Sequence, residues 1–351
     1  MSRYLSREYQ SLQAYVPGEQ PRDMRYVKLN TNENPYPPAP GVIKAVQAEA
    51  GRLELYSDPV CADLRDALAE RYGVQRENVF ISNGSDDILN FAFLAFGGSG
   101  ERAYFPDISY GFYKVYAELY HQPYLEIPLR EDFSIDPADY TALDGFIAIA
   151  NPNAPTGMAL SAAQIESILR SNPDHVVLID EAYVDFGAES CMPLTAKYDN
   201  LLVVQTYSKS RSMAGARLGY AIANAALIAD LEKIKFSTNP YSVNRMTLAA
   251  GVATLKSDDC CAANCRRIVE TRENSVARLK QLGFEVLPSR ANFVFARRPG
   301  VDGDWIYREL KARGVLVRHF NIPRIRDFLR ISIGTPEQME VLFVKLAEIL
   351  K

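Results

Sequence analysis

The chain has 351 residues, of which 48% are hydrophobic and 23% charged, and its formal net charge is −4. We expect two domains, because single hydrophobic cores stop growing at about 250–300 residues. A chain with a net negative charge does not suggest the basic surface that nucleic-acid binding requires. No run of about 18 apolar residues predicts a membrane span, and the N-terminal segment lacks the apolar core of a signal peptide.

The cysteines indicate a reducing compartment. Five cysteines in a chain of this length do not suit a disulfide scaffold, so we expect a cytoplasmic protein. Cys260, Cys261 and Cys265 lie close together, but they form no paired CxxC units and have no histidine nearby. We expect them to fill a helix and to bind no metal.

Apolar runs alternate with helical patterns through the first two thirds of the chain. Strands are expected at 79–82, 102–105, 145–150, 176–180 and 201–206, and helices at about 85–96, about 110–120 and 161–170. The strand runs are nearly continuous and rich in β-branched residues, which favours an α/β fold with a large, mainly parallel sheet covered on both faces.

The pattern changes after about residue 246. A long helical stretch is followed by short strand patterns, which predicts a smaller α+β domain. The first 35 residues are irregular and rich in proline and asparagine. We therefore expect an N-terminal arm (1–35) packed with the small domain, a large domain (36–245) and a small C-terminal domain (246–351).

The segment 206–220 is the most informative part of the chain. Lys209 stands among small hydroxyl residues, and Arg217 follows eight residues later in a glycine-rich stretch. This arrangement is typical of a pyridoxal phosphate enzyme, in which a lysine forms a Schiff base and hydroxyls with an arginine hold the phosphate. Taken alone, the segment also fits a surface lysine and arginine beside a loop.

Polar residues follow four of the expected strands, where ligands bind in open α/β sheets. They are Gly84, Ser85 and Asp86 after the first strand, residues 151–157 after the third, Asp180 and Tyr183 after the fourth, and Ser208 with Lys209 after the fifth. This clustering favours a functional site over chance.

Asp180 ends an apolar strand, so its carboxylate would be partly buried and would need a cation. The protonated nitrogen of a pyridine ring is such a cation, and the pair would keep the ring an effective electron sink. A helix or turn cap is the alternative. Tyr183 is placed to donate its phenol hydrogen to the ring hydroxyl oxygen.

Two further groups are candidates for a phosphate site. Thr206 and Ser208 lie on the same side of an extended segment. Gly84 and Ser85 stand where a strand turns into a helix, whose first N–H groups bind anions. Arg217 offers a bidentate fork to the same phosphate.

Three other side chains are candidates for ring or substrate binding. Tyr110 follows a strand and could stack on a cofactor ring, although a core tyrosine is the alternative. Arg318 and Arg330 each stand in an apolar strand and need anionic partners. These partners would be either anionic groups of a substrate or acidic side chains of the protein itself.

Motifs along nearly the whole chain carry a family resemblance: AYVPGEQP, KLNTNENPYPP, LYSDP, SNGSDD, FPDISYGFY, NPNAPTG, IDEAYVDF, TYSKSRSMAGARLGY, NPYSVN and FLRISIGT. With them the chain resembles the fold-type I, pyridoxal-phosphate-dependent aminotransferases. The lysine segment and DEAY are specific for that superfamily. The YVPGE, LNTNENP and FLRISIGT patterns favour its histidinol-phosphate branch.

The resemblance implies a role for each matching residue. Lys209 would be the Schiff-base lysine and proton shuttle, Asp180 would pair with the pyridine nitrogen, and Tyr183 would contact the ring hydroxyl. Tyr110 would stack on the ring. Tyr56 would reach the phosphate of the partner subunit's cofactor, which implies an obligate homodimer with shared active sites. The phosphate would be held by Gly84, Ser85, Asp86, Ser208 and Arg217, with Thr206 nearby.

Substrate contacts are implied in the same way. Arg330 would clamp the α-carboxylate of glutamate, and Arg318 with Tyr15 would bind the phosphate end of the second substrate. Tyr241 and Asn34 would line the substrate pocket.

One position departs from the family. In the pattern NPNNPTG, the asparagine before PTG contacts the ring hydroxyl, but here that place holds Ala154. We expect Asn153 or Asn151 to substitute, or Tyr183 to carry the contact alone.

The implied reaction is ping-pong transamination between L-histidinol phosphate and 2-oxoglutarate, giving imidazole-acetol phosphate and L-glutamate in histidine biosynthesis. An aromatic or broad-specificity aminotransferase and a threonine-phosphate decarboxylase are alternatives on the same scaffold. A ligand-sensing regulator domain would add a basic helix-turn-helix, yet the chain enters the family pattern by about Tyr15. A catalytically dead relative would lose the lysine or the aspartate, and both are present.

Overall fold

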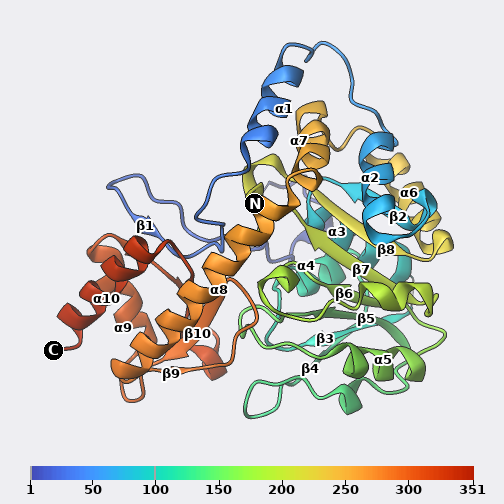
Figure 1. Cartoon of the computed structure of the whole chain (residues 1–351). Helices are drawn as coiled ribbons and strands as arrows, with labels where there is room; N and C mark the ends of the chain where they lie inside the picture. The colour runs from blue at the N-terminus through green and yellow to red at the C-terminus, as the bar shows by residue number, and fades with distance from the viewer. Residues whose placement is uncertain (1, 99) are drawn as a thin grey trace.

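The computed structural model describes residues 2–98 and 100–351, which form a larger and a smaller lobe (Figure 1). The described residues of the larger lobe build a seven-stranded sheet. Its strands, in order across the sheet, are β2 (Val79–Ser82), β8 (Gly219–Ala223), β7 (Leu201–Thr206), β6 (Val177–Asp180), β5 (Gly145–Ala150), β3 (Arg102–Pro106) and β4 (Tyr124–Ile127). Only β8 runs antiparallel to its neighbours. The expected α/β fold with a mainly parallel sheet is confirmed.

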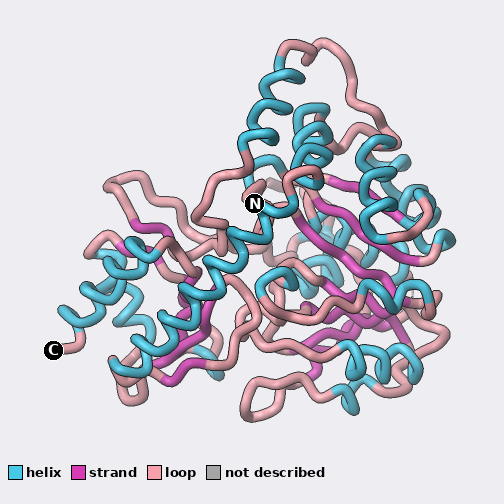
Figure 2. Tube along the Cα trace, in the orientation of Figure 1, coloured by secondary structure: helices cyan, strands magenta, loops and turns pink. Residues whose placement is uncertain are grey.

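Helices cover both faces of this sheet, as Figure 2 shows in cyan around the magenta strands. The buried cores on the two faces separate the helices into two sets. One face packs against α1 (Pro40–Ala50), α2 (Ala62–Tyr72), α5 (Ala162–Ser171) and α7 (Arg245–Leu255), and the other against α3 (Ser85–Phe96), α4 (Phe112–Leu119) and α6 (Ala225–Thr238). Strands buried on both faces explain the continuous apolar runs in the sequence.

The smaller lobe contains a four-stranded antiparallel sheet and three helices. The strand order is β12 (Arg318–His319), β13 (Phe328–Ser332), β10 (Phe293–Arg297) and β9 (Glu285–Val286). The helices are α8 (Asp258–Gln281), which runs from one lobe to the other in Figure 1, α9 (Gly303–Ala312) and α10 (Pro336–Ile349). The expected α+β pattern of this part is confirmed.

The N-terminal arm lies along the smaller lobe. Its strand β1 (Val27–Lys28) pairs in parallel with β11 (Val315–Leu316). Arg318 donates to the backbone carbonyls of Val16 and Pro17 at 2.9 and 3.1 Å, and Lys311 forms an ion pair with Glu19. The arm is therefore anchored to the small lobe by backbone pairing and by charged side chains.

The division of the chain into three parts stays a proposal. Helix α7 packs on α1 and α2, although it follows the boundary that we expected at residue 245. We therefore propose Ser257, between α7 and α8, as the better boundary between the large and small domains.

The sequence located most elements but missed some. The helix at 85–96 and the strands at 79–82, 145–150 and 201–206 are confirmed to the residue. The helix expected from Tyr110 begins at Phe112, because residues 107–111 form a turn after β3. Strand β8 was not predicted, since it directly follows a glycine-rich segment.

Residues 2–98 and 100–351 contain neither a membrane-spanning helix nor a metal-binding cluster. None of their helices is long and apolar enough to cross a membrane. Nor do they include a group of three or more His, Cys, Asp or Glu side chains that could hold a metal ion.

Candidate active site

A cavity of about 220 Å³ lies at the carboxyl ends of β5, β6 and β7, where the sheet meets the arm and the small lobe. Two sets of residues enclose it. The first, which we call the sheet wall, comprises Ser85, Asp86, Tyr110, Ala150, Ala154, Asp180, Ala182, Tyr183, Thr206, Ser208, Lys209, Ala214 and Arg217. The second, which we call the arm wall, comprises Tyr15, Gly18, Asn30, Thr31, Asn32, Glu33, Arg318, Phe320 and Arg330.

Lys209 lies three residues beyond the end of β7 and extends its amine into the cavity. Its Nζ donates to the backbone carbonyl of Thr31 at 3.1 Å and lies 5.8 Å from the ring centre of Tyr183. The amide of Asn34 donates to the carbonyls of Lys209 and Ser210 at 3.1 and 3.2 Å. The lysine backbone is thus held by the arm, while its amine faces the centre of the cavity.

Asp180 is a buried carboxylate at the last residue of β6. Tyr113 donates to it at 3.3 Å and the backbone N–H of Ala182 at 3.1 Å. Burial raises the pKa of Asp180 to about 7, and the nearby charge of Asp86 acts in the same direction. Among the described residues no cation forms an ion pair with Asp180. A cationic group in the cavity would supply the missing partner.

Tyr183 faces the same cavity from just beyond β6. Its ring packs edge-on against Phe293, with 5.0 Å between the ring centres. The side-chain amide of Asn32 donates to its hydroxyl oxygen at 3.0 Å. The phenol is therefore held between the sheet, the small lobe and the arm.

Several hydrogen-bond donors converge around the N-terminus of α3. Thr206 donates to the hydroxyl of Ser208 at 3.0 Å, and Arg217 Nη1 lies 3.3 Å from the same hydroxyl oxygen. A Cβ atom at Gly84 would lie 2.6 Å from Arg217 Nη2, and one at Gly219 would lie 2.5 Å from the backbone nitrogen of Ser85. Glycine at position 84 lets the arginine approach the helix N-terminus, and glycine at position 219 lets strand β8 approach the backbone of Gly84 and Ser85. Such a combination of helix N–H groups, hydroxyls and a guanidinium suits a phosphate.

The side chain of Asp86 bridges two other residues of the sheet wall. Its carboxylate accepts from the hydroxyl of Tyr110 at 2.7 Å and from Arg217 at 3.1 Å. Burial, together with the charge of Asp86, raises the pKa of Tyr110 well above its usual range. Asp86 thus connects the aromatic side of the cavity to the arginine.

Two arginines of the small lobe face the cavity from the opposite side. Arg330 Nη2 donates to the carbonyl of Asn30 at 2.9 Å, while its buried Nε has no hydrogen-bond partner among the described residues. Burial lowers the pKa of Arg330. Tyr15 stacks on Phe112 at 4.2 Å, and burial raises its pKa while Arg330 and Arg318 act against that rise. This side of the cavity is built to receive anions.

Five of the predicted site residues do not line the cavity. Gly84 directly precedes the lining residue Ser85 and contacts Arg217. The side chain of Asn34 bonds to the backbone of Lys209 and does not line the cavity. Asn153 is buried, with its amide donating to Ile108 and Thr156 and accepting from Ser109. The remaining two are Tyr56 and Tyr241, which stack on each other at the surface.

The structure adds residues that sequence reasoning missed. They are the arm residues Asn30, Thr31, Asn32 and Glu33, together with Tyr113 and Phe320. The polar run in LNTNENP was the available signal for the arm residues. Tyr113 gave no signal, because a tyrosine in an amphipathic helix is an ordinary core residue.

Comparison with known proteins agrees with this geometry. The family model for aminotransferase class I and II matches residues 25–346. The chain belongs to this family. It is 47% identical to histidinol-phosphate aminotransferase of Brachyspira hyodysenteriae, with 100% of both chains covered, and 51% identical to that of Marinomonas sp., with 99% of both covered.

Solved structures share the fold at lower identity. The crystal structure of histidinol-phosphate aminotransferase from Sinorhizobium meliloti in complex with pyridoxal-5'-phosphate superposes with a TM-score of 0.90 at 23% identity, covering 100% of this chain and 98% of that one. L-threonine-O-3-phosphate decarboxylase from Porphyromonas gingivalis has a TM-score of 0.81 at 24% identity, covering 92% and 99%. The fold alone therefore does not distinguish an aminotransferase from a decarboxylase.

Proposed function

We propose that this chain transfers an amino group between L-histidinol phosphate and 2-oxoglutarate with pyridoxal phosphate, as a step in histidine biosynthesis. Two full-length relatives of this activity at 47% and 51% identity support the substrate pair. The observation that carries the chemistry is the amine of Lys209 in one cavity with the buried carboxylate of Asp180.

The residues present fit the cofactor. Asp180 is buried and has no cationic partner among the described residues, which matches a protonated pyridine nitrogen. Tyr183 would hold the ring hydroxyl, and Tyr110 would cover one face of the ring. The donors around Gly84, with those of Ser85, Asp86, Thr206, Ser208 and Arg217, would hold the phosphate. When bound, pyridoxal phosphate supplies an electron sink for charge that develops at the substrate α-carbon.

The chain itself moves the proton. Lys209 Nζ acts as general base and acid, taking the proton from the α-carbon and returning it on the other side of the transfer. Its hydrogen bond to the carbonyl of Thr31 holds the free amine in the cavity. Arg330 would orient the α-carboxylate of glutamate, because its Nε has no hydrogen-bond partner among the described residues.

The phosphate end of the substrate would lie against the arm wall. Arg318 carries the positive charge there, and Tyr15 offers a hydroxyl beside it. Arg318 also binds the arm at Val16 and Pro17. Substrate binding and arm docking would therefore depend on the same side chain.

A coupled assay with L-histidinol phosphate and 2-oxoglutarate, run beside phenylalanine, tests this function. We expect glutamate formation with a clear preference for the phosphorylated amine. A preference for phenylalanine would assign the chain to the aromatic aminotransferases. Release of carbon dioxide would assign it to the decarboxylases.

We propose further that the enzyme is a homodimer in which Tyr56 reaches the cofactor phosphate of the partner subunit. Tyr56 is 82% exposed and stacks on Tyr241, which is 44% exposed, at 4.6 Å between ring centres. Leu53, Leu55 and Val60 are exposed in the same segment, so an apolar surface surrounds the tyrosine pair. Such a surface suits an interface between two copies of the chain.

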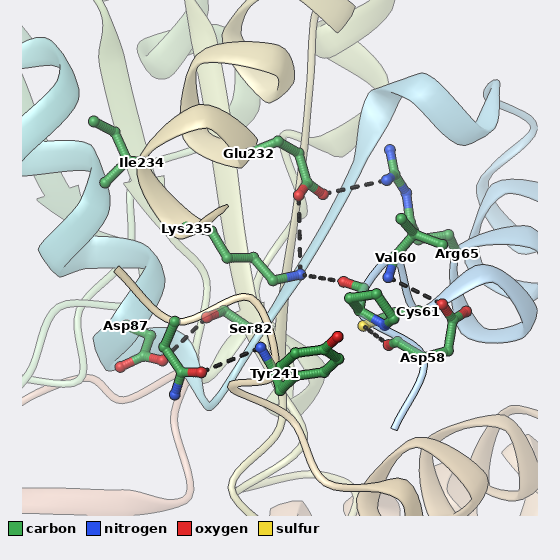
Figure 3. A network of polar contacts seen from close by, with 12 residues as sticks. Asp58, Val60, Cys61, Arg65, Ser82, Asp87, Glu232, Ile234, Lys235 and Tyr241 are labelled. Atoms are coloured by element: carbon green, nitrogen blue, oxygen red, sulfur yellow. Dashed lines mark hydrogen bonds and ion pairs between the residues drawn. The ribbon is translucent and has the colours of Figure 1, made fainter. Parts of the chain in front are cut away.

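The segment that carries Tyr56 is held from inside the lobe (Figure 3). The buried amine of Lys235 donates to the carbonyl of Pro59 at 3.2 Å, and Glu232 lies between Lys235 and Arg65. The hydroxyl of Ser57 donates to the carbonyl of Val243 at 2.6 Å. A firmly anchored segment with an exposed ring is suited to deliver that ring to another subunit.

Mixing two inactive variants tests this arrangement. Tyr56→Ala and Lys209→Ala subunits, refolded together, would form hybrid dimers with one intact site. We expect recovery of about a quarter of the wild-type activity. No recovery, or activity in a monomer on size-exclusion chromatography, would contradict the shared site.

The enzyme is proposed to work in the cytoplasm. All five cysteines are free thiols, which fits a reducing compartment.

A further inference from the structure

Ala154 leaves a hydrogen-bond donor missing on the sheet wall. Its methyl group lines the cavity where the resemblance predicts a carboxamide. The neighbouring amides do not replace it. Asn151 exchanges two hydrogen bonds with the backbone of Leu160, at 2.7 and 3.1 Å. The amide of Asn153 is occupied by Ile108, Ser109 and Thr156.

A carboxamide from the arm wall lies beside Tyr183 instead. Asn32 is 1% exposed and lines the cavity, and its Nδ2 donates to the Tyr183 hydroxyl oxygen at 3.0 Å. An amide nitrogen carries two hydrogens. The second hydrogen of Asn32 has no acceptor among the described residues, so it remains available to a group in the cavity.

The surroundings of Asn32 fix the orientation of this amide. Ser332 donates to its Oδ1 at 2.7 Å and accepts from its backbone N–H at 2.9 Å. Asn292 donates only to the backbone carbonyl of Asn32, at 2.9 Å, and among the described residues it is Ser332 that holds the side-chain oxygen. The φ angle of Asn32 is 57°, in the left-handed region that asparagine tolerates better than most residues. The small lobe therefore holds the amide with its nitrogen toward Tyr183.

We propose that Asn32 supplies the amide donor that Ala154 cannot, so that Asn32 and Tyr183 together hold the ring oxygen of the bound cofactor. This inference rests on the proposed function, because it requires pyridoxal phosphate in the cavity. Donors of this kind favour the deprotonated form of the oxygen that they contact. The cofactor would then be tuned by a residue of the arm, and its electronic state would depend on the arm being docked on the small lobe.

The test is a pH titration of the visible absorbance of the cofactor-loaded protein. Asn32→Gly deletes the carboxamide and still permits the positive φ. We expect the pKa of the absorbance change to rise by about 0.5 to 1, because one neutral donor to the deprotonated oxygen is lost. Adding Ala154→Asn to this variant restores a donor, and the pKa should return toward the wild-type value.

The variants Asn32→Gly, Ala154→Asn and Asn292→Ala leave unchanged the charged and titratable groups that face the cavity: Glu33, Asp86, Asp180, Lys209, Arg217, Arg318, Arg330, Tyr15, Tyr110 and Tyr183. Asn292→Ala is the matched control. It removes a hydrogen bond to the Asn32 backbone but leaves the carboxamide in place, so the absorbance pKa should not move. Asn32→Asp keeps the shape and the acceptor for Ser332, and it should raise the pKa at least as much as Asn32→Gly.

Three results would overturn the inference: an unchanged pKa in Asn32→Gly, an equal rise in Asn292→Ala, or a rise that Ala154→Asn does not reverse. Failure of the proposed function gives a different result. In that case the wild-type protein itself would show no visible absorbance with pyridoxal phosphate.

Discussion

The two walls of the cavity are built in different ways. The sheet wall places its residues at strand ends and at one helix start, where a well-packed sheet fixes each backbone position. The arm wall combines residues of an irregular segment with Arg318, Phe320 and Arg330 of the small lobe, and contacts such as those of Asn32 with Ser332 hold the segment in place. We infer that the rigid wall performs the chemistry and that the arm wall selects the substrate. Substitutions in one wall at a time distinguish these two roles.

The largest expected effect is that of Lys209→Ala on the sheet wall. Without the amine, the general base and the covalent link to the cofactor are both lost. We expect kcat to fall by at least about 10³-fold and the visible absorbance of the protein-bound cofactor to disappear. Steady-state kinetics and an absorbance spectrum measure the two effects. Lys209→Arg keeps the charge and should be equally inactive, whereas a yellow, active Lys209→Ala protein would refute the assignment.

The second prediction concerns the pH dependence of stability in the cofactor-free protein. Burial raises the pKa of Asp180 to about 7, so the folded state holds this proton more tightly than the unfolded state does. Its contribution is therefore complete at acidic pH and is lost as the pH rises from about 4 to about 7. Asp180→Asn cannot ionise, so at pH 8 its free energy of unfolding should exceed that of wild type by up to about 4 kcal/mol.

Urea unfolding at several pH values measures this difference. The two proteins should be equally stable near pH 4, and saturating pyridoxal phosphate should favour wild type at pH 8. A constant stability difference between pH 4 and pH 8 would show that Asp180 is not the titrating group.

The third prediction separates the two amino donors at the arm wall. Histidinol phosphate has no α-carboxylate, whereas glutamate has one for Arg330 to bind. Arg330→Lys loses the bidentate fork, so the KM for glutamate should rise about 30- to 100-fold, while that for histidinol phosphate changes little. Initial rates with each donor provide the comparison. An equal rise for both donors would place Arg330 in the structure of the lobe and not in carboxylate binding.

The two walls also differ in how far the sequence predicted them. Lys209, Asp180, Ser85 and Thr206 could be placed from sequence, because parallel strands bring their carboxyl ends to one edge and local motifs mark each end. Asn32 could not, since its position depends on contacts with residues about 300 positions away. The polarity of the arm is visible in the sequence, but the path of its backbone is not.

Surface residues show the same limit. Tyr56 and Tyr241 were assigned to the site by resemblance, but in one chain they lie at the surface. A site completed by a second subunit has no signal in the hydrophobic pattern of a single chain. Asn153 and Asn151 were the candidates to replace the missing amide at Ala154, with Tyr183 alone as the alternative, yet the amide of Asn153 bonds to Ile108 and Thr156 and that of Asn151 to Leu160.

The most direct test of the division between the walls is the effect of Arg318→Ala on phosphate recognition. The quantity is the ratio of kcat/KM for L-histidinol phosphate to that for L-histidinol. We predict that the ratio falls roughly tenfold, because a charge-assisted contact to the phosphate is lost, while the cofactor stays bound. Lys311→Ala, which loosens the arm at Glu19 away from the cavity, should leave the ratio at its wild-type value. An unchanged ratio in Arg318→Ala would contradict the account.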